Sequence, residues 1–402
     1  MSGSAWAEPR RHWPVILACF WLAVFAWGFG FYGHAIYLAE LRARFGWPTG
    51  VISAATTTMY LGGALTMPWV HPAMRRFGPG RVLMAGACLL GVGAIGFATA
   101  TAPWQLFLSA LPMAVGWACA TGTAIATALA VWFDRGRPLA LSLALNGASA
   151  SGFLVAPLLG WMTGWLGLDR AVPWLVGLCW LVLLPLLALC LRRTLVVAAT
   201  ATEATGGVPD GRAGFATRRD ALRARRVWGV MLPFALALAA QVGFIVHMVA
   251  FLMPALGPAG TSQAVALASV AAMLGRIGAG LVIDRLPQRG FSALSFLVQA
   301  LGLLLLFLWP AGGWTLYLGS VLFGLSVGNV ITLPAIVLQR EFASRSFGLL
   351  VGLNGAIGQF TLSIAPVLFG LMRDLAGHYR PVLILCITLQ VLAAWLIRRP
   401  VT

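Results

Sequence analysis

One arginine inside a long apolar stretch is the residue of this sequence with the clearest chemical potential. Arg276 lies in the stretch 262–283, eight residues before Asp284, or about 12 Å along a helix. If that stretch crosses a bilayer, its guanidinium lies near the centre, where an arginine costs roughly 3 to more than 10 kcal/mol. All ten acidic residues fall in loops or at the ends of apolar stretches. Arg276 therefore predicts an anionic ligand, since a guanidinium binds a carboxylate in bidentate geometry.

A structural role is the alternative for Arg276, with backbone carbonyl groups and water as its partners. The residues on its helical face are small, Ala272 among them, and would leave room for a ligand. The small size of these neighbouring residues favours a binding role for Arg276 over a structural role.

Two histidines and two asparagines in apolar stretches are further candidates for substrate contacts. His34 follows the glycine-rich segment 28–33, which contains Tyr32 and could bend a helix beside a cavity. The imidazole titration range suits a proton carrier, and a histidine bonded to a carbonyl group is the alternative for both His34 and His247. Asn146 and Asn354 could bind substrate or could link neighbouring helices by hydrogen bonds.

The sequence carries no signature of an enzyme, a cofactor or a metal centre. It contains no lysine, which a phosphate-binding loop of an ATPase requires. Its six cysteines are scattered singly, with no CxxC pair and no Cys/His cluster. We expect a protein that is not an enzyme and needs no cofactor.

Composition places these candidates in a membrane protein. Of the 402 residues, 60% are hydrophobic and 9% are charged, whereas soluble domains carry about 25% charged residues. Lipid leaves backbone groups unsatisfied unless they bond within a helix or a closed barrel, and the period-two alternation of a barrel is absent. The fold class is therefore an all-α membrane protein with twelve predicted transmembrane helices, at 14–39, 49–70, 81–101, 103–132, 138–165, 172–191, 228–256, 262–283, 291–310, 314–338, 347–372 and 381–397.

The charge distribution predicts the topology. The net charge is +17, and most of the arginines fall in loops on one side of the predicted membrane. That asymmetry follows the positive-inside rule, which predicts a multi-pass protein of the cell (inner) membrane with both termini cytoplasmic. It also excludes nucleic acid as a partner, because no basic face is free of the lipid bilayer.

The chain divides into two halves that resemble each other. Leu145-Asn146-Gly147-Ala148 recurs 208 residues later as Leu353-Asn354-Gly355-Ala356. We predict two six-helix bundles, 1–191 and 228–402, with a substrate site at the bilayer midplane between them. The joining segment 192–227 is a basic cytoplasmic linker with eight arginines. Its second part, from Phe215 to Trp228, could be an amphipathic helix on anionic headgroups or a flexible tether.

Two turns resemble a loop motif of the major facilitator superfamily. The turn after 262–283 has the glycine, the aspartate and the arginine of that motif, at Gly280, Asp284 and Arg285. The turn after 49–70 matches its second part, at Gly78 and Arg81, but has His71 and Arg75 where the motif has glycine and aspartate. The resemblance implies the superfamily fold, alternating access, and a gate in which the motif's Asp and Arg pair with helix ends of the neighbouring bundle.

A narrower resemblance is to monocarboxylate transporters and oxalate–formate exchangers. It rests on Arg137-Pro138-Leu139-Ala140 followed by Asn146-Gly147-Ala148, on Val246-His247-Met248, and on Gly275-Arg276. The resemblance implies that Arg276 anchors the carboxylate of a small organic anion. In that group a lysine lies near the position of His34 and an aspartate at the position of Ala272, so proton symport and exchange both stay open. The alternatives are an exporter of hydrophobic drugs and, from a different class, a non-transporting membrane receptor or assembly factor.

Overall fold

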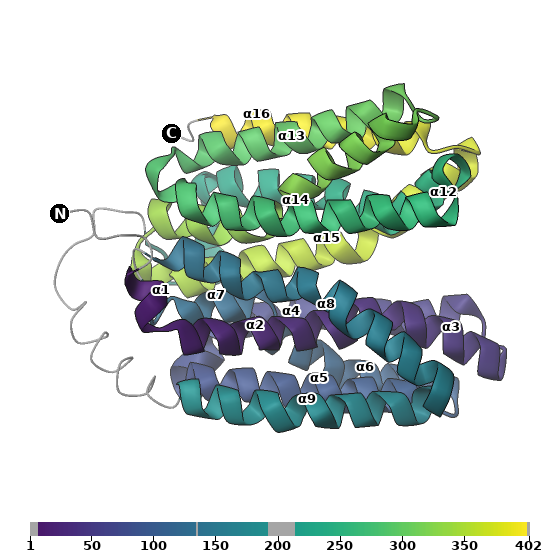
Figure 1. The fold of residues 1–402 in the computed structure, drawn as a ribbon. Helices are drawn as coiled ribbons and strands as arrows, with labels where there is room; N and C mark the ends of the chain where they lie inside the picture. The colour runs from purple at the N-terminus through teal and green to yellow at the C-terminus, as the bar shows by residue number, and fades with distance from the viewer. Residues whose placement is uncertain (1–6, 134–135, 192–213, 400–402) are drawn as a thin grey trace. The chain divides into compact units, whose positions relative to one another are not determined.

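The computed structural model describes residues 7–133, 136–191 and 214–399, and every regular element in them is a helix (Figure 1). Within these residues, eleven helical segments are long and apolar enough to cross a membrane. They are Trp13–Phe45, Pro79–Ala98, Pro103–Leu129, Arg137–Leu166, Leu168–Cys190, Arg225–Gly257, Gln263–Arg285, Gln288–Leu308, Gly313–Glu341, Ser344–Arg373 and Arg380–Arg398. Each coincides with a predicted span, so the all-helical membrane fold is confirmed.

The remaining predicted span, 49–70, lies in α4 (Thr49–Phe77), a helix of 29 residues. Its sequence is more polar than those of the other spans, with Thr56-Thr57-Thr58 near its start and Arg75-Arg76 in its last turn. One face is nevertheless buried, including Ile52, Met59 and Met67. Packing inside a helical unit thus accounts for a helix that composition alone marks weakly.

Contacts group the chain into two units, residues 1–211 with 351–356 and residues 212–350 with 357–402. Unit 1 contains the helices that correspond to the first six predicted spans. They are α1 (Ala7–Arg11), α2 (Trp13–Trp27), the π-helix η1 (Gly28–Tyr32), α3 (Gly33–Phe45), α4, α5 (Pro79–Ala98), α6 (Pro103–Ala120), α7 (Gly122–Leu129), α8 (Arg137–Leu166) and α9 (Leu168–Leu191).

Unit 2 contains the helices that correspond to the last six spans, except for the part of α15 that groups with unit 1. They are α11 (Arg218–Arg223), α12 (Arg225–Val282), the 3₁₀-helix η2 (Ile283–Arg285), α13 (Gln288–Leu308), α14 (Gly313–Glu341), the 3₁₀-helix η3 (Ser344–Ser346), α15 (Phe347–Ala376) and α16 (Arg380–Arg398). The long α12 holds two predicted spans, which meet at Gly257, where φ is 65°. Glycine adopts that left-handed conformation without a steric penalty, so the chain turns there between two membrane crossings.

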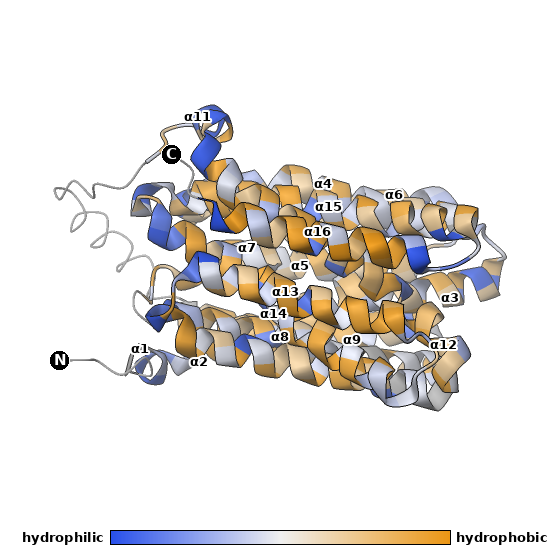
Figure 2. Ribbon diagram, turned by 90° about the horizontal axis from the view of Figure 1, so that it is seen from above, coloured by the Kyte–Doolittle hydropathy of each residue, from blue (hydrophilic) through white to orange (hydrophobic). Residues whose placement is uncertain are grey.

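Small residues allow the helices of each unit to approach closely. In unit 1, a Cβ atom at Gly147 of α8 would overlap the Phe20 carbonyl of α2. In unit 2, a Cβ atom at Gly275 of α12 would overlap the Leu325 carbonyl of α14. Lipid offers little hydrophobic driving force between helices, so such close backbone packing is a main source of stability. Along the helices hydrophobic residues dominate, and hydrophilic ones concentrate toward the ends (Figure 2).

The internal repeat is visible in the elements themselves. Helices α8 and α15 each have 30 residues, and each has one proline inside, Pro157 and Pro366. Most of the predicted linker, residues 192–213, lies outside the described residues. The bundle boundaries 1–191 and 228–402 therefore stay a prediction.

Candidate functional site

Arg276 lies in the second membrane crossing of α12 and is almost fully buried, with 1% of its surface exposed. Its Nε donates a hydrogen bond to the backbone carbonyl of Gly328 in α14, at 3.3 Å. The hydroxyl of Thr332, one turn further along α14, donates to the same carbonyl oxygen at 3.2 Å. The Gly328 carbonyl group is neutral, so this hydrogen bond orients the guanidinium and does not change its charge. Arg276 thus brings a buried and oriented positive charge into unit 2.

The close approach of α14 explains how this bond forms. A Cβ atom at Gly328 would lie 2.6 Å from the Ala272 carbonyl oxygen and 2.9 Å from Arg276 Nε. The space that the sequence suggested for a ligand at Ala272 is therefore occupied by the backbone of α14. Only glycine at position 328 fits against both Ala272 and Arg276.

The sequence-predicted His34 lies in the first turn of α3, in a buried aromatic setting of unit 1. The ring centroids of Tyr37, Tyr60 and Phe97 lie 5.4–5.8 Å from that of His34, which is 8% exposed. Its Nδ1 lies 3.3 Å from the Thr56 hydroxyl, and its Nε2 lies 3.2 Å from the Met59 sulfur. Both ring nitrogens therefore have a neighbour from α4, and no backbone carbonyl is needed to hold the ring.

The glycine-rich segment before His34 forms the π-helix η1, which changes the winding of the first membrane helix within one continuous helical segment. The hydroxyl of Tyr60 donates to the Gly30 carbonyl at 2.9 Å. Tyr32 ends η1, and a Cβ atom at Gly152 of α8 would lie 3.0 Å from its ring. Short π-helical insertions occur often at functional sites. Tyr32 at the end of η1 lies against Gly152 of α8, whereas His34 in α3 lies against Thr56 and Met59 of α4, so the two side chains face different helices.

The other three candidates lie on three different helices. Asn146 is buried in α8, whereas Asn354 in α15 is partly exposed. His247 in α12 donates from Nε2 to the Pro366 carbonyl at 3.1 Å, and its Nδ1 lies 3.5 Å from the Tyr379 hydroxyl. These contacts match the alternative of a histidine bonded to a carbonyl group.

The two turns of the loop motif differ in their partners. Gly78 joins α4 to α5 with φ of 84°, a backbone conformation that favours glycine at this position. Arg81, in the first turn of α5, is exposed. After α12, Asp284 in η2 forms an ion pair with Arg340 of α14 at 2.7 Å, and Arg285 is exposed. The buried Gly280 precedes this turn by one helical turn. This pair lies within unit 2, because η2 places Asp284 next to the end of α14. The gate role of the motif stays a prediction.

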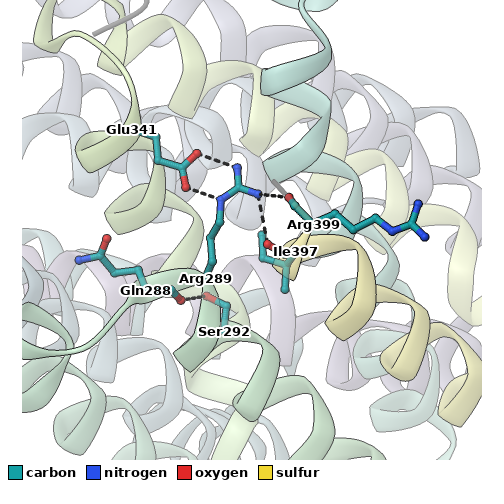
Figure 3. Close-up of polar contacts among 6 residues, drawn as sticks. All are labelled: Gln288, Arg289, Ser292, Glu341, Ile397 and Arg399. Carbon is teal, nitrogen blue, oxygen red and sulfur yellow. Dashed lines mark hydrogen bonds and ion pairs between the residues drawn. The ribbon is translucent and has the colours of Figure 1, made fainter. Parts of the chain in front are cut away.

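Sequence reasoning missed a second arginine site at this end of unit 2. Arg289 of α13 binds Glu341 of α14 in bidentate geometry, with N–O distances of 2.5 and 2.7 Å. Its NH1 also donates to the carbonyl groups of Ile397 and Arg399 at the end of α16, so one side chain joins three helices (Figure 3). The internal repeat could have identified Arg289, because it lies 208 residues after Arg81, which is the spacing of the repeat.

Three glutamines in the core of unit 2 were also missed as a group. Gln299 of α13 donates to Gln241 of α12 at 3.2 Å, and Gln390 of α16 donates to Gln299. All three side chains are at most 1% exposed. They come from helices that are far apart in the sequence, so spacing offers no clue to them. Their hydrogen bonds satisfy polar groups inside an apolar bundle and so join three helices.

Comparison with known proteins agrees with this architecture. The Major Facilitator Superfamily model matches residues 20–366. The chain is 25% identical to Monocarboxylate transporter 13 of Bos taurus, covering 91% of this chain and 84% of the relative. It is 28% identical to the 2-nitroimidazole transporter of Escherichia coli (strain K12), covering 87% and 86%. The crystal structure of the human organic anion transporter MFSD10 (TETRAN) has the same fold, with a TM-score of 0.74, 16% identity and coverage of 98% and 100%. The match across most of the chain shows that this protein belongs to the Major Facilitator Superfamily, as a multi-pass secondary transporter and not an enzyme.

Proposed function

We propose that this transporter carries a small organic anion of the monocarboxylate class by alternating access, and that Arg276 anchors the carboxylate. The observation that carries the proposal is the burial of this guanidinium within a membrane helix, held by a carbonyl group. A charge at that depth is costly and marks a functional residue by default. A carboxylate balances the charge and matches the planar fork of the guanidinium.

Two acidic residues of unit 2 stabilise the ends of its helices through ion pairs with arginines. Asp284, eight residues after Arg276, is paired with Arg340, and Glu341 is paired with Arg289. Both pairs lie at the ends of helices.

The relatives support the class of substrate. Monocarboxylate transporter 13 of Bos taurus aligns over most of both chains. On this basis we propose that Tyr32, His34, Asn146, His247 and Asn354 contribute further substrate contacts, with His34 as the group that carries a proton where transport is symport. We also propose an inner-membrane location with cytoplasmic termini, from the distribution of arginine.

The first test is thermal stabilisation of the purified protein by lactate, pyruvate, formate and oxalate. A ligand that binds only the folded protein stabilises it by about 2.7 kcal/mol at a concentration of one hundred times Kd. Arg276→Gln removes charge-assisted hydrogen bonds worth about 1.5–3 kcal/mol, so affinity should fall about tenfold to over a hundredfold. Arg170→Gln, which removes the same charge from an exposed position, is the matched control and should bind normally.

A second variant keeps the test valid if Arg276→Gln is unstable. Arg276→Lys retains the charge but loses the planar fork, so it should bind carboxylates more weakly than the native protein while staying responsive to them. A melting shift that is equal in the native and the Arg276 variants, or no shift with any of the four anions, would contradict the proposal.

A neutral nitroaromatic or other hydrophobic compound is the second candidate substrate. It is favoured by the alignment with the 2-nitroimidazole transporter of Escherichia coli. Uptake or efflux of 1-methyl-2-nitroimidazole in proteoliposomes distinguishes the two candidates, because this compound has no ring N–H to lose and so gains no charge pairing with Arg276. Transport of 1-methyl-2-nitroimidazole that persists in Arg276→Gln would favour this second function.

A further inference from the structure

The arginine-rich segment that precedes the first membrane helix of unit 2 has a defined structure. We call residues 214–228 the basic segment. The sequence leaves open an amphipathic helix on anionic headgroups and a flexible tether, and the structure shows a short helix, α11, that is separated from α12 by a bend. Helix α11 ends at Ala224, where the backbone is extended (φ −79°, ψ 117°), and α12 begins at Arg225.

One end of the basic segment is attached to the turn between α14 and α15. The Phe215 N–H donates to the Ser346 hydroxyl at 2.7 Å, and that hydroxyl lies 3.3 Å from the Phe215 carbonyl oxygen. The Phe215 ring packs on Phe342, with centroids 5.8 Å apart. Ser346 is fully buried, so this attachment is shielded from water. The segment is therefore held against unit 2.

Two local bonds fix the rest of the basic segment. Thr217 caps α11 by accepting a hydrogen bond from the Asp220 N–H at 3.2 Å, and its hydroxyl donates to the Asp220 carboxylate at 2.6 Å. The Trp228 indole N–H donates to the Leu222 carbonyl at 2.7 Å, which closes the bend at Ala224. The only acidic side chain of the segment is thus engaged with its own cap.

The surface that the basic segment presents combines positive charge with apolar side chains. Four of its arginines are exposed: Arg219, Arg223, Arg225 and Arg226. Leu222 and Trp228 are each 39% exposed beside them. Arg219 and Arg223 are four residues apart and so share one face of α11. In Figure 2, α11 is among the most hydrophilic elements.

We propose that the basic segment binds the anionic phospholipid headgroups of the membrane surface on which α12 begins. The segment runs directly into a membrane helix, which holds it at the level of the headgroups. Guanidinium groups bind lipid phosphate, while an indole and a leucine enter the boundary between headgroups and acyl chains. The exposed apolar side chains favour a lipid surface over a soluble acidic partner. This proposal is independent of the transported substrate.

The experiment is limited trypsin digestion of the full chain in nanodiscs. The sequence has no lysine, so trypsin cleaves only after arginine. Discs of phosphatidylcholine are compared with discs that also contain phosphatidylglycerol. We expect cleavage after Arg219, Arg223, Arg225 and Arg226 to slow at least fivefold in the anionic discs. A soluble arginine-containing reporter peptide added to each digestion is the control and should be cleaved at the same rate in both.

A double variant tests whether the arginines cause the protection. Each arginine near an anionic surface contributes about fivefold in affinity, so Arg219→Gln/Arg223→Gln should restore rapid cleavage after Arg225 and Arg226. Arg10→Gln/Arg11→Gln removes the same charge elsewhere and should leave the protection intact. High salt should also abolish it.

Three results would overturn the proposal. Equal cleavage of the basic segment in both kinds of disc would show that anionic lipid does not bind there. Equal protection in both would show that the chain itself shields the arginines. Equal slowing of the soluble reporter peptide would show a general effect of the discs on the protease.

Discussion

A glycine opposite Arg276 provides the sharpest test of how the candidate anchor is held. In Gly328→Ala, the new methyl group would lie 2.6 Å from the Ala272 carbonyl oxygen and 2.8 Å from Arg276 Cβ. Ordinary C–O contacts are about 3.3 Å or longer, so α12 and α14 must separate by roughly 0.7 Å. A separation of that size lengthens the bond of 3.3 Å between Arg276 Nε and the Gly328 carbonyl beyond hydrogen-bonding distance.

The expected cost follows from overpacking. Added methyl groups in packed cores cost about 1–3 kcal/mol, and one kcal/mol shifts the melting temperature of a unit of about 200 residues by about 2–4 °C. Gly328→Ala should therefore lower Tm by about 2–12 °C in detergent. Gly278→Ala is the matched control, because Gly278 has nothing within 4 Å of a new Cβ atom. That variant should be neutral or slightly stabilising, since alanine is the better helix former.

Carboxylate binding separates the packing effect from the effect on the anchor. If Arg276 binds substrate, Gly328→Ala should weaken the carboxylate-induced rise in Tm, whereas Gly278→Ala should leave it unchanged. A Gly328→Ala protein with a Tm equal to that of Gly278→Ala would refute the packing argument. Normal carboxylate binding in a destabilised Gly328→Ala protein would instead refute the link between the Gly328 carbonyl and the anchor.

Three further predictions concern the other polar residues. Arg289→Gln should lower the free energy of unfolding by about 1.5–3 kcal/mol. A double-mutant cycle with Glu341→Gln should show a coupling energy of about 0.5–3 kcal/mol, whereas additive effects would mean that the ion pair contributes little. Gln299→Leu should cost about 1–3 kcal/mol, because Gln241 and Gln390 each lose the hydrogen bond to Gln299 inside the core, and an unchanged Tm would argue against the network. His34→Gln should retain carboxylate binding in the thermal assay but lose accumulation driven by an imposed pH gradient in proteoliposomes, and unchanged accumulation would assign His34 a structural role.

The membrane helices could be predicted from the sequence because lipid imposes a simple condition. A segment of about 20 apolar residues must satisfy its backbone groups within itself, so composition and length predict the span. The same condition singled out Arg276, whose charge inside such a segment requires compensation. The first interruption, at Gly28–Tyr32, could be anticipated from its glycines, and the structure shows it as a π-helix. The sequence of α4 gives only a weak signal for a membrane helix, because its polar residues lower its hydropathy. Packing within the unit accommodates those residues.

What only the tertiary structure decided is which side chains meet. The Gly328 carbonyl lies 52 residues from Arg276, and Arg340 lies 56 residues from Asp284. Gln299 and Gln390, which are 91 residues apart, bond in the same core. Hydropathy and spacing say that a residue lies in a membrane helix, but they say little about the direction in which that helix is turned. The partner of each polar group depends on which helix faces pack together, and that is determined by the fit of small residues such as Gly275 and Gly328 against a neighbouring backbone.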